Sequence, residues 1–491
     1  MNIVWRKDWI YEYESPWSIF EKVSLANLVG RNEILHVFGT PQVKGMKQHI
    51  GDVHRELMCL TGFNLDLLDE ILGFNLKEHN QKIIQSLISP FHAYFNSPDP
   101  WFYKDLHWCS KCLEGGFHSW LHQFKLLDEC VFHELKLNNI CPNCKEGIPF
   151  LLSNKRLDCA FQCKCGHRLA IFHESSWNEW MGAEHINQAV LRWIQSNMNQ
   201  ENLETKWIVH PNHCNLKMLI EEEPEEIKHI VSSEPIQQNY FHSNLFRKEQ
   251  LKICSKTFQK IEKNLLQGIL RNHHHCIHQL LELKKKDDLA EFPLICPYAY
   301  AYVFWRKSLL KEVLFYGFDP TRDDLTSNTA PMLIEDHIEY FVTQLITFQK
   351  LTYGTIDRNI IFWFLEKLVS EFSESFFRAW FEIAGKRSEK INVPKWGEIL
   401  EMRDKSFPKV ALKCSINKQI NYIEYHLSKS NESISIKFDC PNQNETARSN
   451  IKAMNSYTPH AVALMVRGSK PDMDLIKLQK SVEAYVKKLN F

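Results

Sequence analysis

The feature that most constrains this chain is a run of cysteine and histidine residues between positions 109 and 167. Eight of them form four closely spaced pairs, which are Cys109 with Cys112, Cys130 with His133, Cys141 with Cys144, and Cys163 with Cys165. Ligands one or two residues apart on a tight turn can bind one metal ion from the same side. Two such pairs complete the tetrahedron of soft ligands that zinc prefers.

The order of the pairs predicts two consecutive metal sites. The first site consists of Cys109, Cys112, Cys130 and His133, and the second consists of Cys141, Cys144, Cys163 and Cys165. Each has four protein ligands and no open position for water or substrate, so both read as structural zinc sites, two per chain. Cys159 and His167 compete for the last ligand position. A disulfide framework is the alternative, but it requires an oxidising compartment.

The same stretch resembles the TniQ/TnsD family, the target-selection proteins of heteromeric cut-and-paste transposons. The residues that carry the resemblance are His107-Trp-Cys-Ser-Lys-Cys-Leu113, Cys130-Val-Phe-His133, Cys141-Pro-Asn-Cys144, Cys163-Lys-Cys-Gly166 and, loosely, Glu14-Ser-Pro-Trp-Ser18. Family members often have a C-P-x-H-G pattern, whereas this chain has Val131 and Glu134 at the proline and glycine positions. The departure concerns the geometry of that turn, and the resemblance covers roughly residues 10 to 170.

The resemblance implies a protein that binds double-stranded DNA at an attachment site. Its N-terminal helical and zinc part would recruit an AAA+ ATPase, which bridges to the transposase. One alternative is an adaptor between an RNA-guided effector and the transposition machinery, and another is a host regulatory or defence protein that reuses the zinc module. The long stretch beyond the linker favours direct DNA reading.

Composition favours a helical, multi-domain protein. The chain has 491 residues, which is too long for one core, and 44% of them are apolar, which is ample for burial. Its 17 glycines are about half the usual share, which favours helix over a β-rich fold. Lys+Arg and Asp+Glu number 59 each, so any DNA contact must come from local patches rather than from net charge.

These patterns predict a mainly α fold in four parts. The parts are an N-terminal helical region at 1–104, a double-zinc module at 105–172, a helix and linker at 173–240, and a helical DNA-binding region at 241–491. Ser15 and Pro16 predict the start of the first helix and Gly30 its end. Residues 221–238 combine charge, proline and serine, which is typical of a solvated connector, so the main domain boundary is placed there.

The segment from 245 to 310 is the candidate DNA-binding element. We expect a turn and N-cap at Cys254-Ser-Lys-Thr257, which would allow a helix-turn-helix, although a plain helical hairpin is at least as common in α domains. The candidate DNA-contacting residues are Lys256, Lys260, Arg271, Arg306 and Lys307.

A histidine-rich run follows this segment. His273, His275, Cys276, His278 and Cys296 are possible ligands of a third metal. Because no C-x-x-C pair brackets them, a surface or phosphate-facing run is the favoured interpretation.

Sequence motifs for catalysis are missing. The chain has no phosphate-binding G-x-x-x-x-G-K-[ST] loop, no H-E-x-x-H and no G-x-S-x-G, so we expect neither an ATPase nor another enzyme. Charged residues interrupt the first thirty positions, and no apolar run reaches the roughly 18 residues that a membrane span needs. With metal-like cysteine spacing, this favours the reducing cytoplasm and no membrane partner. The resemblance to DNA-binding target selectors implies association with the nucleoid.

Overall fold

The computed structural model divides the chain into two compact units. The first comprises residues 1–223 together with 413–417, and the second comprises 224–412 and 418–491. The structure describes residues 3–46, 50–92, 99–152, 159–172, 180, 185–198, 205–231, 244–268, 270–273, 276, 296–302, 305, 335–386, 396–416, 421–428 and 440.

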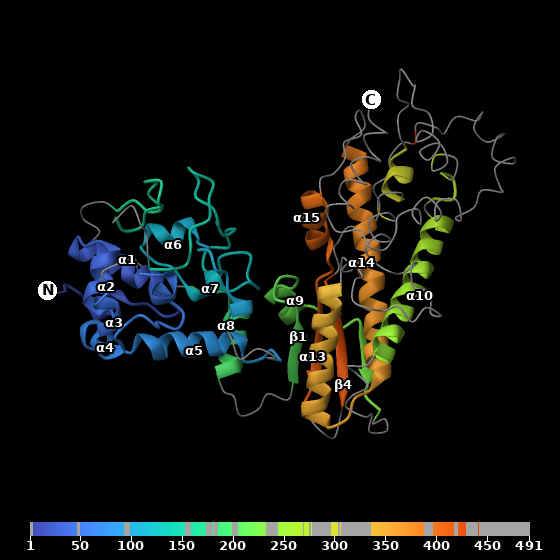
Figure 1. The fold of residues 1–491 in the computed structure, drawn as a ribbon, viewed down its shortest axis with the longest axis horizontal. Coiled ribbons are helices and arrows are strands. Elements are labelled where there is room, and N and C mark those ends of the chain that lie inside the picture. The colour runs from blue at the N-terminus through green and yellow to red at the C-terminus, as the bar shows by residue number, and fades with distance from the viewer. Residues whose placement is uncertain are drawn as a thin grey trace, which may run out of the picture. The chain divides into compact units, whose positions relative to one another are not determined.

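The first unit is built from short helices (Figure 1). Its α-helices are α1 (Pro16–Asn27), α2 (Arg31–Phe38), α3 (Pro41–Lys44), α4 (Leu65–Leu72), α5 (Leu76–Ile88), α6 (Ser110–Glu114), α7 (Trp120–Gln123), α8 (Gln188–Met198) and α9 (Leu216–Glu221). Single turns of 3-10 helix form at Lys7–Trp9, Asp52–Arg55 and Asp99–Trp101, and β1 spans Thr205–Val209.

Local capping explains where several of these helices begin. The Asn64 side chain accepts a hydrogen bond from the Leu67 backbone N–H, and Asn75 does the same for Glu78. Each asparagine thereby satisfies one of the N–H groups that a helix start leaves without a partner. These caps fix the starts of α4 and α5.

The first helix begins where the sequence predicts and ends earlier. Ser15 occupies the N-cap position and Pro16 the first helical position, as expected. The expected end at Gly30 is wrong: α1 stops at Asn27 because Leu28 adopts a left-handed conformation with φ of 52°. Gly30 instead precedes α2 as its N-cap.

The second unit is organised around the long helix α14 (Arg358–Lys386). It packs against α10 (Asn244–Gly268), α13 (Glu335–Tyr353) and α15 (Trp396–Ser406) (Figure 1). The buried face of α14 is rich in aromatic residues, among them Phe372, Phe376 and Trp380, and their burial stabilises this unit.

Three strands lie beside these helices, namely β2 (Glu226–His229), β3 (Val410–Ser415) and β4 (Tyr422–Leu427). Strand β4 lies between β3 and β2. It pairs with β2 antiparallel, with Glu226 opposite Tyr425 and His229 opposite Tyr422. Residues 226–229 therefore belong to a sheet, and the prediction of a solvated connector is wrong for this part of 221–238.

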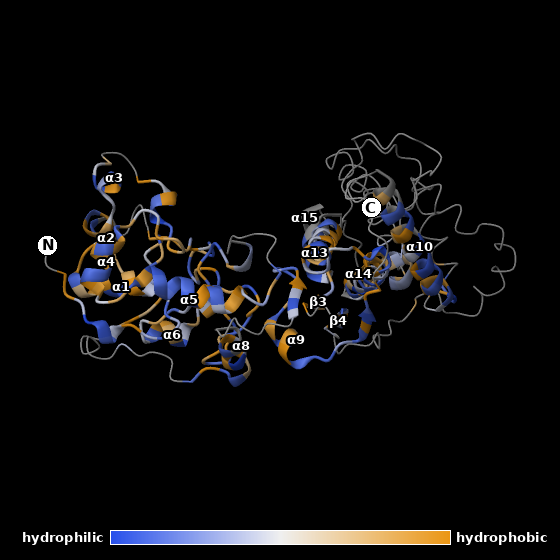
Figure 2. Ribbon diagram, turned by 90° about the horizontal axis from the view of Figure 1, so that it is seen from below, coloured by the Kyte–Doolittle hydropathy of each residue, from blue (hydrophilic) through white to orange (hydrophobic). Residues whose placement is uncertain are grey.

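The expected turn inside the candidate DNA-binding element is wrong as well. Residues 254–257 lie within α10, which continues without a break from Asn244 to Gly268. The Thr257 hydroxyl donates to the Ile253 carbonyl one helical turn earlier, so it bonds within the helix rather than capping a new one. Helix α10 carries hydrophobic and hydrophilic residues along its length (Figure 2). Three of its hydrophobic side chains, Phe258, Ile261 and Leu265, are buried.

About half of the structure is helical, so the prediction of a mainly α fold is confirmed in part. The small antiparallel sheet was not predicted. Its strands are short. Strand β2 is charged and alternates between partly buried and exposed residues, so its sequence is typical of a connector. Among the described residues, no helix is both long and apolar enough to cross a membrane.

Candidate metal centres

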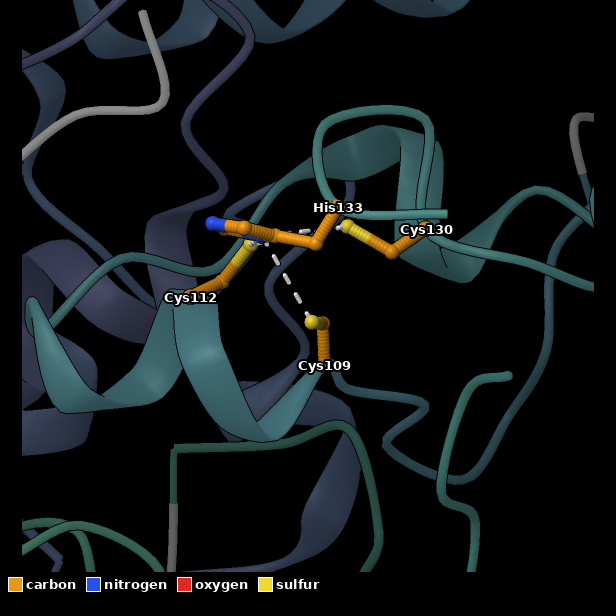
Figure 3. Close-up of side chains that lie close together, drawn as sticks. All are labelled: Cys109, Cys112, Cys130 and His133. Carbon is orange, nitrogen blue, oxygen red and sulfur yellow. Dashed lines mark hydrogen bonds between the residues drawn. The ribbon is translucent and has the colours of Figure 1, made fainter. Parts of the chain in front are cut away.

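The first predicted ligand set comes together in the first unit (Figure 3). Cys112 Sγ lies 3.2 Å from His133 Nδ1 and 3.6 Å from Cys130 Sγ. Cys109 Sγ and Cys130 Sγ each lie 3.7 Å from the same ring nitrogen. Zinc bound tetrahedrally at its usual distances places neighbouring sulfur and nitrogen ligands about 3.5–3.8 Å apart. The four side chains therefore have the spacing of a tetrahedral metal site.

The second predicted ligand set also comes together. Cys141 Sγ lies 3.7 Å from Cys165 Sγ, and Cys144 Sγ lies 3.7 Å from Cys163 Sγ. All four ligand atoms lie within 4.8 Å of one another. Cys159, an alternative ligand, is exposed, and neither it nor His167 belongs to a ligand cluster of the described residues.

Sharp turns bring the paired ligands to the same side. The residue after the second ligand of a pair adopts a left-handed backbone in three cases, at Glu134 (φ 53°), Lys145 (φ 61°) and Gly166 (φ 86°). The Glu134 N–H donates to the Cys130 carbonyl, and the Lys145 N–H donates to the Cys141 carbonyl. The missing glycine after His133 therefore does not alter the turn, since Glu134 takes the left-handed conformation itself.

Two histidines that the sequence did not single out support the first cluster. His122 is buried, and its Nδ1 accepts a hydrogen bond from the Ser119 backbone N–H, which leaves the proton on Nε2. His122 Nε2 lies 3.5 Å from Cys130 Sγ and donates to it. Burial lowers the pKa of His122 to about 4, so the ring is a neutral hydrogen-bond donor to Cys130.

His118 connects the start of α1 to the stretch at 105–172 that carries the two clusters (the metal module). Its Nδ1 lies 2.6 Å from the Ser15 hydroxyl, and its Nε2 lies 2.8 Å from the His107 carbonyl oxygen. The Ser15 N–H also donates to the His118 carbonyl. The Ser15 side chain thus bonds to the module rather than capping its own helix, which ties the N-terminal helices to the first cluster.

The thiols of the first cluster do not ionise independently. Hydrogen bonding to Cys112 lowers the pKa of Cys109, and the same contact raises the pKa of Cys112. Thiolates this close repel one another unless a cation lies between them. A divalent ion would remove that repulsion and allow all three cysteines to ionise.

The second cluster is more exposed to solvent than the first. Cys165 is exposed, and hydrogen bonds from the Asn143 side chain and the His167 backbone lower its pKa to about 6. Burial raises the pKa of Cys163 to about 12. A stabilised thiolate beside protonated thiols suits metal binding, in which each thiol that binds gives up its proton.

A third cluster forms in the second unit from His273, Cys276, Cys296 and Cys440. Three of these residues belong to the histidine-rich run and its neighbour that the sequence marks as possible ligands. The other two candidates, His275 and His278, lie outside the described residues. Cys440 was not predicted from the sequence, because no nearby ligand pair marks it.

Three of the predicted DNA-contacting residues lie on α10 or just after it. Lys256 and Lys260 are exposed on α10, and Arg271 is exposed in the turn that follows it. Lys260 Nζ lies 3.7 Å from a Glu366 carboxylate oxygen, with both side chains largely exposed. Arg306 and Lys307 lie outside the residues that the structure describes.

No protein-family model, curated protein or solved structure matches this chain. Its function must therefore be inferred from the residues and their geometry.

Proposed function

We propose that the two clusters of the first unit each bind one zinc ion. Their seven cysteines and one histidine form the soft donor sets that favour zinc over harder cations such as magnesium. Each ion would have four protein ligands and no open position, so its role is structural rather than catalytic. The ions stabilise a module whose segments are short turns with little regular structure.

On this basis, the protein is a DNA-binding target-site selector of a heteromeric cut-and-paste transposon. The observation that carries the proposal is the pair of four-ligand clusters, formed in the order C-x-x-C, C-x-x-H, C-x-x-C, C-x-C that the TniQ/TnsD resemblance predicts. The contacts of His118 with Ser15 add support, because they join the Glu14-Ser-Pro-Trp-Ser18 segment of the same resemblance to the metal module.

A basic surface on α10 supports a role in DNA binding. Lys252, Lys256, Lys260 and Lys263 are exposed along the helix, and the acidic Glu262 among them is buried. Steps of four residues advance about 6 Å along a helix, so three of these lysines form a row on one side. The exposed contact of Lys260 with Glu366 is too weak to neutralise the row. Lysines in such a row can bind the phosphates of one DNA strand.

The first unit is then the region that recruits an AAA+ ATPase, and through it the transposase. The chain itself performs no chemistry in this role; it acts in the cytoplasm at the nucleoid, where its DNA lies. This division places recruitment on the zinc module and target recognition on the second unit.

The test is selective DNA binding by the full-length protein. Protein purified with its metal is incubated with a pool of random duplexes, and bound DNA is recovered over repeated rounds. We expect one sequence to be enriched and then protected from nuclease in the presence of excess random DNA. Equal binding of all duplexes would contradict target selection, and binding that requires an RNA-guided effector would favour the adaptor alternative.

A further inference from the structure

Four buried side chains in the second unit converge at the end of α10. Cys276 Sγ lies 3.6 Å from Cys440 Sγ, Cys440 Sγ lies 3.5 Å from Cys296 Sγ, and Cys296 Sγ lies 3.4 Å from His273 Nδ1. At most 6% of each of these residues is exposed. Their spacing is that of the first two clusters, and it matches the separation of about 3.5–3.8 Å between the ligands of tetrahedral zinc.

Neither a disulfide bond nor chance packing accounts for this convergence. The three cysteines form no disulfide bond, since the Cys276–Cys440 and Cys440–Cys296 sulfur distances of 3.6 and 3.5 Å are far from the roughly 2.05 Å of an S–S bond. Three cysteines also cannot pair completely among themselves, so one thiol would remain. Chance contact of buried thiols does not explain the ring nitrogen that completes the fourth corner.

The local backbone presents these ligands as metal sites usually do. His273 and Cys276 form an H-x-x-C pair in the turn after α10, where the His273 N–H donates to the Leu270 carbonyl. Cys296 stands directly before a helical segment at 297–302, and the Ala299 backbone N–H donates to its sulfur.

The surrounding side chains hold the ligands in place. The Tyr298 ring stacks on the His273 ring, with centroids 4.0 Å apart, and contacts Phe381 of α14 at 4.7 Å. The Tyr302 hydroxyl donates to Glu262 of α10, and Trp305 Nε1 donates to the Ser373 carbonyl of α14. The segment that carries Cys296 is therefore fixed to both long helices of the second unit.

We propose that His273, Cys276, Cys296 and Cys440 bind a third zinc ion. Three thiolates and one imidazole form a complete set of four ligands, so this ion is structural. Binding releases the three thiol protons. The ion joins the end of α10 to the segment of Cys296 and to Cys440, which lies 164 residues from Cys276. It thereby stabilises the helix that carries the lysine row, but the site itself does not depend on the proposed DNA function.

Metal content of the full-length protein tests this site directly. Native mass spectrometry of protein purified without added zinc should show three zinc ions per chain, two from the first unit and one from this site. The Cys440→Ala variant should retain two. The matched control is Cys254→Ala, since Cys254 is equally buried in α10 and belongs to no ligand cluster of the described residues; it should retain three.

A ligand-preserving substitution separates metal binding from general packing. Cys440→His restores a donor at the same position and should regain the third ion. Histidine could not substitute in this way for a cysteine that only packs in the core. Two ions in the wild type, a disulfide among these cysteines, or three ions in Cys440→Ala would overturn the proposal. Should Cys440→Ala fail to fold, the count of the wild type still decides. Loss of selective DNA binding with three ions present would contradict the proposed function alone.

Discussion

The Glu14 carboxylate and the Lys22 ammonium lie 2.7 Å apart, and neither side chain is exposed to solvent. Lys22 also donates to the Trp9 carbonyl and lies over the ring of Tyr11. Burial lowers the pKa of Lys22, and the Glu14 carboxylate opposes that shift. The pair joins α1 to the segment before it, beside the contact of Ser15 with the metal module.

Breaking this pair should be costly, and removing it altogether should cost less. Glu14→Gln or Lys22→Met leaves a buried charge without its counter-charge, and each should lower the free energy of unfolding by about 3–5 kcal/mol. Chemical denaturation of both single variants and the double variant measures this. The double variant should be more stable than the sum of the two losses predicts. Additive losses would show that the charges do not interact.

Replacing Glu134 by glycine should destabilise the protein less than the same replacement at Glu129. Its left-handed backbone costs a residue with a side chain about 1 kcal/mol or more, and glycine removes that cost. Glu134→Gly should therefore be neutral or stabilising in thermal denaturation. The control is Glu129→Gly, at an exposed position with ordinary backbone, which should lose about 0.5–1 kcal/mol from glycine entropy alone. Equal losses of stability in the two variants would contradict the inference that the Glu134 backbone is strained.

Glu226 should stabilise the second unit at neutral pH and not in acid. Hydrogen bonds from Lys228, Lys367 and Trp363 lower its pKa from 4.5 to about 2. Because the folded pKa lies below the unfolded value, this stabilisation is present above about pH 4.5 and is lost as the pH falls towards 2. Glu226→Gln should lower the melting temperature at pH 7, and the difference from wild type should shrink below pH 4.

Glu339→Gln is the control for this change, since Glu339 is exposed on α13 of the same unit. It should behave as wild type across the pH range. A deficit of Glu226→Gln that is the same at pH 3 and pH 7 would show that the charge is not responsible.

The lysine row of α10 should affect DNA binding without regard to sequence. Lys256→Ala combined with Lys260→Ala removes two phosphate contacts, and the slope of log K against log salt should become shallower by about 1.8. Binding to specific and random duplexes should weaken alike, because phosphate contacts carry no sequence information. Lys350→Ala, an exposed change on α13, should leave both unchanged. An unaltered slope in the double variant would exclude α10 from the DNA interface.

The clusters of candidate metal ligands in the first unit could be predicted because each pair is local. A turn of four residues decides whether Cys141 and Cys144 face the same side. The chain between the two pairs of a site is short enough to bring all four ligands together. The third cluster was only partly predictable. Cys440 reaches it from far along the chain, and no pattern near it marks a ligand.

The incorrect predictions have equally specific causes. Gly30 is a good helix terminator, but Leu28 adopts the left-handed conformation before the chain reaches it. Ser255 and Thr257 suggest a helix N-cap. The helix nevertheless continues through them, because Cys254 and Phe258 on either side are buried in the core. Strand β2 is short and charged, and it forms because β4, distant in sequence, provides its partner. In the last two cases tertiary contacts override the local signal.

The central claim is that the first unit contains two separate four-ligand zinc centres, and a zinc count on single-cysteine variants tests it most directly. Cys112→Ser and Cys144→Ser should each lose one zinc ion relative to the wild type, and the double variant should lose two. Cys159→Ser, at an exposed cysteine outside both clusters, should lose none. A double variant that loses no more zinc than either single variant, or no loss in any of them, would contradict the claim.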